Sequence, residues 1–235
     1  MKPVAIFRHL AAEGPGYFAT YLTRRNVPWR LVRIDEGEVV PADPREFSGL
    51  VFMGGPMSAN DRLPWIEAAL ELIRGAVVHE VPVLGHCLGG QFMAKALGGH
   101  VTRNPVKEIG WGSVDVVRSD VAALWFGDEL TSFESFHWHG ETFSIPQGAT
   151  RILESPHCAN QAFALGPHLG LQCHVEMTPA LVRDWCAAWG KEVESLAQRV
   201  PSVQTPAQMN QDLEDRTRKL NLIADRVYDR WIAGL

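Results

Sequence analysis

Short apolar segments alternate with longer amphipathic segments over the first 100 residues of the chain. Runs of β-branched and large apolar residues bounded by glycine, proline or polar residues are typical of buried strands. Such runs predict strands at residues 4–7, 29–34, 50–53 and 81–84. Helical spacing predicts helices at residues 64–79 and 87–97, and Gly98 and Gly99 end the second helix. This alternation predicts an α/β fold with a mostly parallel sheet.

The pattern changes after residue 100. Short apolar runs then follow one another at hairpin-like spacing, at residues 112–117, 132–139, 150–154, 161–165 and 169–174. These runs predict an antiparallel or mixed extension of the sheet. Helices are expected at residues 179–189 and 206–231, with a loop between them. The last helix has apolar residues on one face, which predicts packing on the main domain or at a subunit interface: Leu213, Leu220, Ile223 and Val227.

Composition narrows the range of partners. The 235 residues fit one large core, and a net charge of −5 without a basic block argues against nucleic acid as the partner. No apolar run approaches the roughly 20 residues that cross a bilayer, so no membrane partner is expected. Arg8 and His9 interrupt the N-terminal apolar run, which favours a first strand over a signal peptide. A cytoplasmic location is therefore expected. The substrate is therefore expected to be a small molecule.

Cysteine spacing points to one thiol in particular. The four cysteines lie far apart and form no CxxC pair, so neither a disulfide framework nor a zinc knuckle is expected. Cys87 lies between a buried strand and a helix, within Gly85-His86-Cys87-Leu88-Gly89. This is the pattern of a nucleophile elbow, in which glycines permit a sharp turn and the helix N-terminus favours a thiolate. A buried structural cysteine after a glycine-rich strand end is the alternative.

A base and its orienting carboxylate follow later in the chain. His174 and Glu176 are two residues apart, so on a strand both side chains would project to one face. A cysteine nucleophile needs an imidazole that takes its proton and a carboxylate that orients the imidazole. Cys87, His174 and Glu176 supply these three roles. The alternative is a core histidine beside a surface glutamate.

Three segments together carry a resemblance to a known family. Residues 54–58 (GGPMS), 85–91 (GHCLGGQ) and 172–176 (QCHVE) resemble the signature segments of class I glutamine amidotransferases. The similarity covers residues 45–180 and implies a flavodoxin-like three-layer sandwich. It further implies a catalytic domain at residues 1–190, with residues 191–235 as a helical extension packed on it.

The resemblance also implies roles for further residues. Gly55 and Leu88 match the two backbone donors of the oxyanion hole, and Gln91 matches a position that holds the glutamine substrate. A plain turn at Gly55 and a solvent-facing Gln91 are the alternatives. Two positions depart from the family pattern: His86 stands where a small aliphatic residue is common, and Val175 replaces a frequent proline. No metal and no organic cofactor is implied.

The implied reaction is attack of Cys87 on the γ-amide of glutamine or of a γ-glutamyl compound, followed by hydrolysis of the thioester. Residues 107–116 and 136–166 resemble stand-alone relatives of the glutaminase domain of GMP synthase, a broad group that includes plant γ-glutamyl peptidases. The chain has no ATP-binding loop. Either the ammonia passes to a partner subunit, or the enzyme simply hydrolyses its amide. A catalytically silent or partner-activated homologue, and a homo-oligomer, stay open.

Two histidines on one predicted strand are further candidates. His137 and His139 alternate with Trp138, so they share one face with Glu141. The resemblance favours substrate binding by the two histidines. A metal-dependent hydrolase that uses this trio is the rival hypothesis. Trp111 and Trp138 are expected either at the substrate pocket or in the core.

Overall fold

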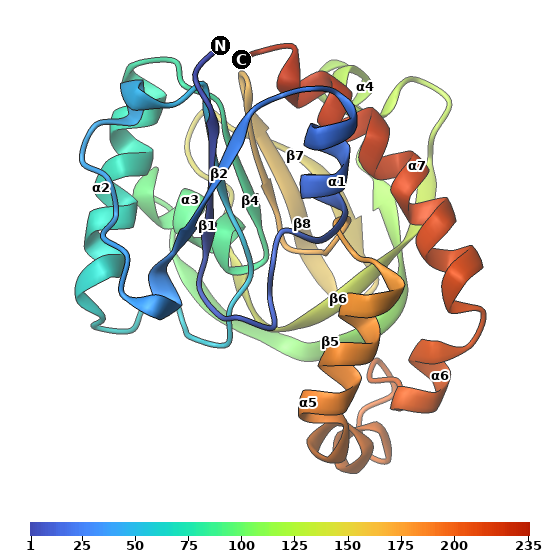
Figure 1. Ribbon diagram of the computed structural model, residues 1–235. Coiled ribbons are helices and arrows are strands. Elements are labelled where there is room, and N and C mark those ends of the chain that lie inside the picture. The colour runs from blue at the N-terminus through green and yellow to red at the C-terminus, as the bar shows by residue number, and fades with distance from the viewer.

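A computed structural model describes residues 1–235, which form one nine-stranded sheet with helices on both faces (Figure 1). The strands are β1 (Val4–Arg8), β2 (Trp29–Arg33), β3 (Gly49–Phe52), β4 (Val83–His86), β5 (Val101–Val116), β6 (Ser132–Phe143), β7 (Thr150–Ser155), β8 (Cys158–Leu165) and β9 (His168–Leu171). The helices are α1 (Gly16–Arg24), α2 (Pro64–Val78), α3 (Leu88–Ala96), α4 (Asp120–Phe126), α5 (Pro179–Ala197), α6 (Pro206–Asn210) and α7 (Leu213–Ile232).

The sheet has the strand order β2-β1-β3-β4-β9-β8-β7-β5-β6. The first five strands of this order pair in parallel, and every later pairing is antiparallel. The predicted mixed α/β sheet is confirmed, with parallel pairing confined to one half. Short turns join β7 to β8 and β8 to β9, and connections of this length permit only antiparallel neighbours.

The two faces of the sheet pack against different helices. Val4 and Ile6 of β1 join a core that includes residues of α1, α5 and α7. Ala5 and Phe7, the alternate residues of the same strand, join a second core with residues of α2 and α3. The predicted three-layer arrangement is thereby confirmed (Figure 1). None of the helices combines the length and the apolar character that a membrane crossing requires.

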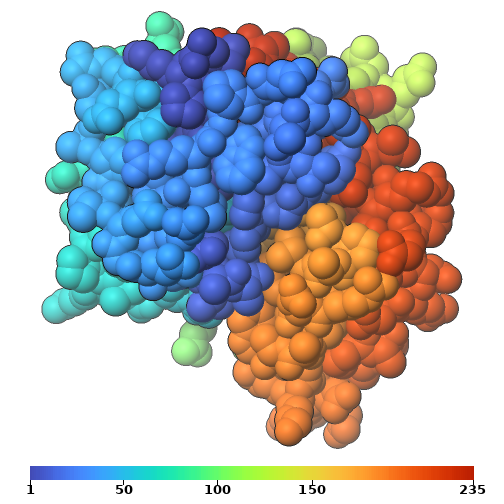
Figure 2. Space-filling view, viewed as in Figure 1, coloured from blue at the N-terminus to red at the C-terminus, as the bar shows by residue number.

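The C-terminal helices differ from the prediction. The single helix expected at residues 206–231 is wrong, because Asp212 adopts a left-handed conformation (φ 51°) that separates α6 from α7. The predicted packing of α7 is confirmed, since Leu213, Leu220 and Val227 are buried. In Figure 2 the C-terminal segment lies directly against the N-terminal part of the chain. The predicted boundary at residue 190 lies inside α5. The division into residues 1–190 and 191–235 stays a prediction.

Two strands differ from their predicted bounds in ways that affect the site. The run at residues 112–117 is only the end of β5, which begins at Val101. The strand pairs with β6 on both sides of an irregularity between Arg103 and Glu108. Pro105 lies in this irregularity, where a missing N–H interrupts the ladder. Strand β9 ends at Leu171, and the chain then crosses towards β6, where the His174 N–H donates to the Phe136 carbonyl. This crossing leaves His174 beside the end of β4.

Candidate active site

The turn between β4 and α3 has the geometry of a nucleophile elbow. Cys87 lies between them with φ 49° and ψ −103°, a strained conformation for a residue with a side chain. A Cβ atom on Gly85 would overlap the Gly89 backbone, and one on Gly89 would overlap the Phe52 carbonyl. The two glycines therefore let the strand, the turn and the helix pack closely, as the sequence predicted. The thiol of Cys87 is nearly buried.

His174 and Glu176 form a tight buried pair beside this thiol. Nδ1 of His174 lies 2.6 Å from Oε1 of Glu176. Burial alone would lower the pKa of His174, but the charges of Glu176 and of a Cys87 thiolate raise it well above the usual value. Burial likewise opposes ionisation of Glu176, yet His86 and His174 bring the pKa of Glu176 down to about 2. The pair can therefore hold an imidazolium next to a thiolate.

Two free backbone amides flank the thiol. Gly55 follows β3 outside any helix or strand, and its N–H has no acceptor among the backbone groups of the chain. Leu88 is the first residue of α3, so its N–H has no intrahelical partner. The two residues adjoin, since a Cβ atom on Gly55 would lie 2.8 Å from Cδ2 of Leu88. The structure thus brings both predicted oxyanion donors to the Cys87 turn.

Gln91 is buried rather than solvent-facing. Its Nε2 donates to Oε1 of Gln172 at 3.2 Å and to the Glu141 carbonyl at 3.4 Å. Gln172 in turn donates from Nε2 to Sγ of Cys87 at 3.5 Å. Sequence reasoning missed Gln172, although its even spacing from His174 and Glu176 was a usable signal.

A pocket of about 850 Å³ opens over these groups. This volume lies in the range of small-molecule sites. Its lining combines the reactive groups with side chains from β6 and α5, among them Cys87, His174, Gln91, Trp138, Trp185 and Trp189. Gly55 and His139 also border it. The site therefore presents a thiol, an imidazole and the Gly55 loop to one ligand-sized space.

Comparison with known proteins agrees with this geometry. Residues 17–183 match the family model described as glutamine amidotransferase class-I. The chain belongs to the class I glutamine amidotransferase family. It is similar to a glutamine amidotransferase crystal structure from Methylobacillus flagellatus, with 47% identity and a TM-score of 0.97 over 100% of this chain and 96% of that one.

Three further proteins are similar to this chain. YfeJ, a glutamine amidotransferase-like protein of Salmonella typhimurium, is 32% identical over 72% of this chain and 74% of its own length. The GMP synthase of Neisseria meningitidis is 32% identical over 55% of this chain, and that match covers 24% of the longer relative. One GMP synthase subunit from Sulfolobus acidocaldarius is 32% identical over 57% of this chain and 69% of its own length.

The two histidines of β6 lie in different surroundings. His139 borders the Cys87 pocket, whereas His137 borders a separate space of about 200 Å³. The predicted contact of His137 with the substrate therefore has no support in the geometry. Burial lowers the pKa of His137 to about 4, so its ring is neutral at physiological pH.

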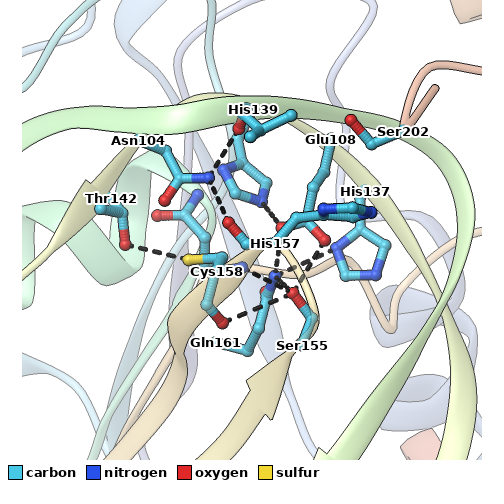
Figure 3. Close-up of polar contacts among 12 residues, drawn as sticks. Asn104, Glu108, His137, His139, Thr142, Ser155, His157, Cys158, Gln161 and Ser202 are labelled. Carbon is cyan, nitrogen blue, oxygen red and sulfur yellow. Dashed lines mark hydrogen bonds and ion pairs between the residues drawn. The ribbon is translucent and has the colours of Figure 1, made fainter. Parts of the chain in front are cut away.

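A buried carboxylate, Glu108, lies close to these histidines (Figure 3). Oε2 of Glu108 lies 3.0 Å from Nε2 of His139 and accepts from Nε2 of Gln161 at 2.7 Å. Oε1 of Glu108 accepts from the Ser155 hydroxyl at 2.8 Å. Nδ1 of His139 faces the Glu141 carbonyl at 3.0 Å. His139 therefore fixes the backbone of the pocket wall at Glu141.

The rival metal trio is arranged differently from the prediction. Glu108, and not Glu141, completes a group with His137 and His139 whose ligand atoms lie within 4.8 Å of one another. Glu141 instead accepts from the Ser58 hydroxyl at 2.8 Å. A metal at the trio would have to displace the hydrogen bonds that already occupy Glu108 and His139.

Three other positions left open by the sequence are now placed. Trp138 borders the pocket, while Trp111 packs in the core and donates from Nε1 to the Met209 carbonyl at 2.9 Å. His86 is fully buried behind the pair, with Nε2 at 3.7 Å from Oε2 of Glu176 and 3.2 Å from the Tyr228 hydroxyl. Burial lowers the pKa of His86, and the charge of the Glu176 carboxylate opposes that shift.

Sequence reasoning also missed Glu13 at the pocket and Tyr228 behind His86. Glu13 lies in the loop after β1 and borders the pocket beside His174. No local pattern distinguishes Glu13 or Tyr228, because their neighbours come from distant parts of the chain.

Proposed function

We propose that this protein hydrolyses the γ-amide of glutamine or of a γ-glutamyl compound through a γ-glutamyl thioester on Cys87. The observation that carries the proposal is the strained Cys87 thiol held at one pocket with the buried His174–Glu176 pair. Membership of the glutamine amidotransferase family supports it.

Acylation forms the thioester on Cys87 and releases the amide nitrogen. The Cys87 thiolate attacks the amide carbon, and the carbonyl oxygen becomes an oxyanion that accepts hydrogen bonds from the amides of Gly55 and Leu88. Each such donor contributes about 3–4 kcal/mol in comparable sites. The C–N bond then breaks, and the His174 imidazolium gives its proton to the departing nitrogen. Glu176 keeps the ring oriented throughout.

Deacylation reverses the roles. Water attacks the thioester carbon while neutral His174 takes a proton from it. The C–S bond then breaks, which releases glutamate and restores the thiolate and imidazolium. Gln91 and the backbone near Glu141 are suited to hold the glutamyl part, because both border the pocket next to the thiol.

The test is a steady-state assay of glutamate release from glutamine and from γ-glutamyl amides. We expect turnover by the wild type, loss of at least about 10⁴-fold in Cys87→Ala, and unchanged turnover in Cys186→Ala. Cys186 is a matched control because its half-buried thiol lies on α5, away from the elbow. Equal turnover in Cys87→Ala would refute the mechanism.

Transfer of ammonia to a partner subunit is the second form of this function. The observation that favours it is the relative from Sulfolobus acidocaldarius, which is named as one subunit of GMP synthase. A purified chain that reacts with a glutamine-like electrophile but turns over slowly would support this form. Fast turnover by the isolated chain would support a stand-alone hydrolase.

A further inference from the structure

Glu13 is a carboxyl group at the reacting centre that the proposed reaction does not use. Its side chain is 8% exposed and borders the same pocket as Cys87 and His174. Oε2 of Glu13 packs against Gly54, and Cε1 of His174 borders the same position. The carboxyl therefore lies at the edge of the His174 ring, next to the loop that carries Gly55.

This carboxyl has no partner within the protein. Each of the other two buried carboxylates described above has partners, since Glu176 binds His174 and Glu108 binds His139, Ser155 and Gln161. No hydrogen bond or ion pair satisfies the Glu13 side chain, and burial raises its pKa to about 7. A buried polar group that faces a pocket without a partner indicates a ligand group that would complete it.

The position of His174 identifies which part of the substrate Glu13 would face. His174 gives its proton to the departing nitrogen, so groups around its ring surround the leaving group. Trp185 packs edge-on against that ring, with centroids 5.0 Å apart, and its Nε1 donates to the carbonyl of Ala12, the residue before Glu13. Trp189 packs against Trp185. Glu13 and these two rings thus lie on the leaving-group side.

Charged side chains also border the pocket near Gln91. Arg103 and Glu141 are paired across β5 and β6, and both border the pocket near Gln91. The two cations of the lining, Arg103 and Lys107, both lie on β5 and are exposed. Glu13 lies instead in the loop after β1, buried beside His174. Ammonia, the leaving group of glutamine, has no second charged group that could pair with Glu13.

We propose that Glu13, Trp185 and Trp189 form a leaving-group subsite for a primary amine that carries a second, cationic nitrogen. The preferred substrates are then γ-glutamyl amides of such amines, and the inference rests on the proposed function. The amide C–N bond breaks with transfer of the His174 proton to the first nitrogen. The second nitrogen keeps its proton throughout, paired with Glu13 and placed near the aromatic rings, which favour cations.

The experiment compares two amides of equal chain length, the γ-glutamyl amides of 1,4-diaminobutane and of n-butylamine. We expect kcat/KM to be at least about tenfold higher for the charged amide, in line with one buried charge-assisted contact. Glu13→Gln should reduce this preference to less than threefold by slowing the charged amide alone. Glu192→Gln is the matched control, because Glu192 borders the same pocket but is exposed, and it should keep the preference.

The outcomes separate this inference from the proposed function. Equal kcat/KM for the two amides in the wild type, or a preference that survives in Glu13→Gln, would overturn the subsite while hydrolysis through Cys87 stands. Cleavage of neither amide, nor of glutamine, would instead overturn the proposed function and the subsite with it. The wild-type comparison remains decisive even if Glu13→Gln does not fold.

Discussion

The protein has two buried histidine–carboxylate pairs, which differ in what surrounds the histidine ring. In the pair His139–Glu108, both ring nitrogens face oxygen acceptors, and both carboxylate oxygens have partners. In the pair His174–Glu176, one ring nitrogen binds the carboxylate, and the ring also interacts with Cys87. Burial and close pairing are therefore common to both, whereas a reactive atom next to the ring belongs to one alone.

This difference distinguishes a pair that can transfer a proton from a pair that only holds the pocket wall in place. A saturated network holds backbone in place, as His139 does at the Glu141 carbonyl. An unsaturated pair next to a strained thiol can move a proton. The comparison predicts that equivalent changes in the two pairs will have very different kinetic effects.

The largest expected difference is between Glu176→Gln and Glu108→Gln. We expect Glu176→Gln to lower kcat by about 10³–10⁴-fold, because the amide cannot stabilise the imidazolium. Glu108→Gln should lower kcat/KM by about tenfold, because it only loosens the pocket wall. Steady-state kinetics of both variants with glutamine measures this. Equal losses in the two variants would break the distinction.

Glu13 offers a test in which loss of a carboxylate stabilises the protein. Its pKa is raised from 4.5 to about 7, so the folded state binds the proton more tightly than the unfolded state. The stability that this adds is fully present below pH 4.5 and is lost as pH rises through 7. Glu13→Gln should therefore unfold at higher denaturant above pH 7, by up to about 3 kcal/mol, with little change at pH 4. Destabilisation at pH 8 would show that Glu13 has a structural partner.

The support behind Glu176 predicts a smaller effect. Tyr228 on α7 contacts His86, which lies next to the Glu176 carboxylate. Tyr228→Phe should lower kcat by about two- to fivefold, with KM unchanged, because one indirect hydrogen bond is lost. Tyr21→Phe is the control, since that hydroxyl donates to Asp229 away from the pair. Equal effects of the two variants would show that His86 and Tyr228 do not support the Glu176 carboxylate.

The smallest expected effect is that of metal removal. Because hydrogen bonds already occupy Glu108 and His139, we expect EDTA treatment and added Zn²⁺ to leave kcat and the unfolding temperature unchanged. The rival metal site would be established if the wild type lost activity with EDTA and regained it with Zn²⁺, while His137→Ala showed neither change.

The sequence predicted the parts of the molecule that depend on local pattern. The elbow around Cys87 and the strands β1 and β3 follow from glycine placement and from apolar runs, which act over a few residues. The break at Asp212 was not predicted, because helical periodicity continues through it and a left-handed residue leaves no apolar signature.

The candidate site was predictable only where its residues lie in recognisable segments. Cys87, His174 and Glu176 lie in such segments, and the structure places them together. Glu13 and Tyr228 reach the site through packing between distant segments, and Glu108 replaces Glu141 beside the histidines because β5 pairs with β6 through an irregular register. Such contacts depend on tertiary structure that no short segment encodes.

The central claim is that Cys87 is a nucleophile in a glutamine-binding pocket. Mass spectrometry of the intact protein after treatment with 6-diazo-5-oxo-norleucine tests it most directly. We predict one adduct per chain, mapped to Cys87, present in the wild type and in Cys186→Ala and absent in Cys87→Ala. An adduct that persists in Cys87→Ala, or no adduct in the wild type, would contradict the claim.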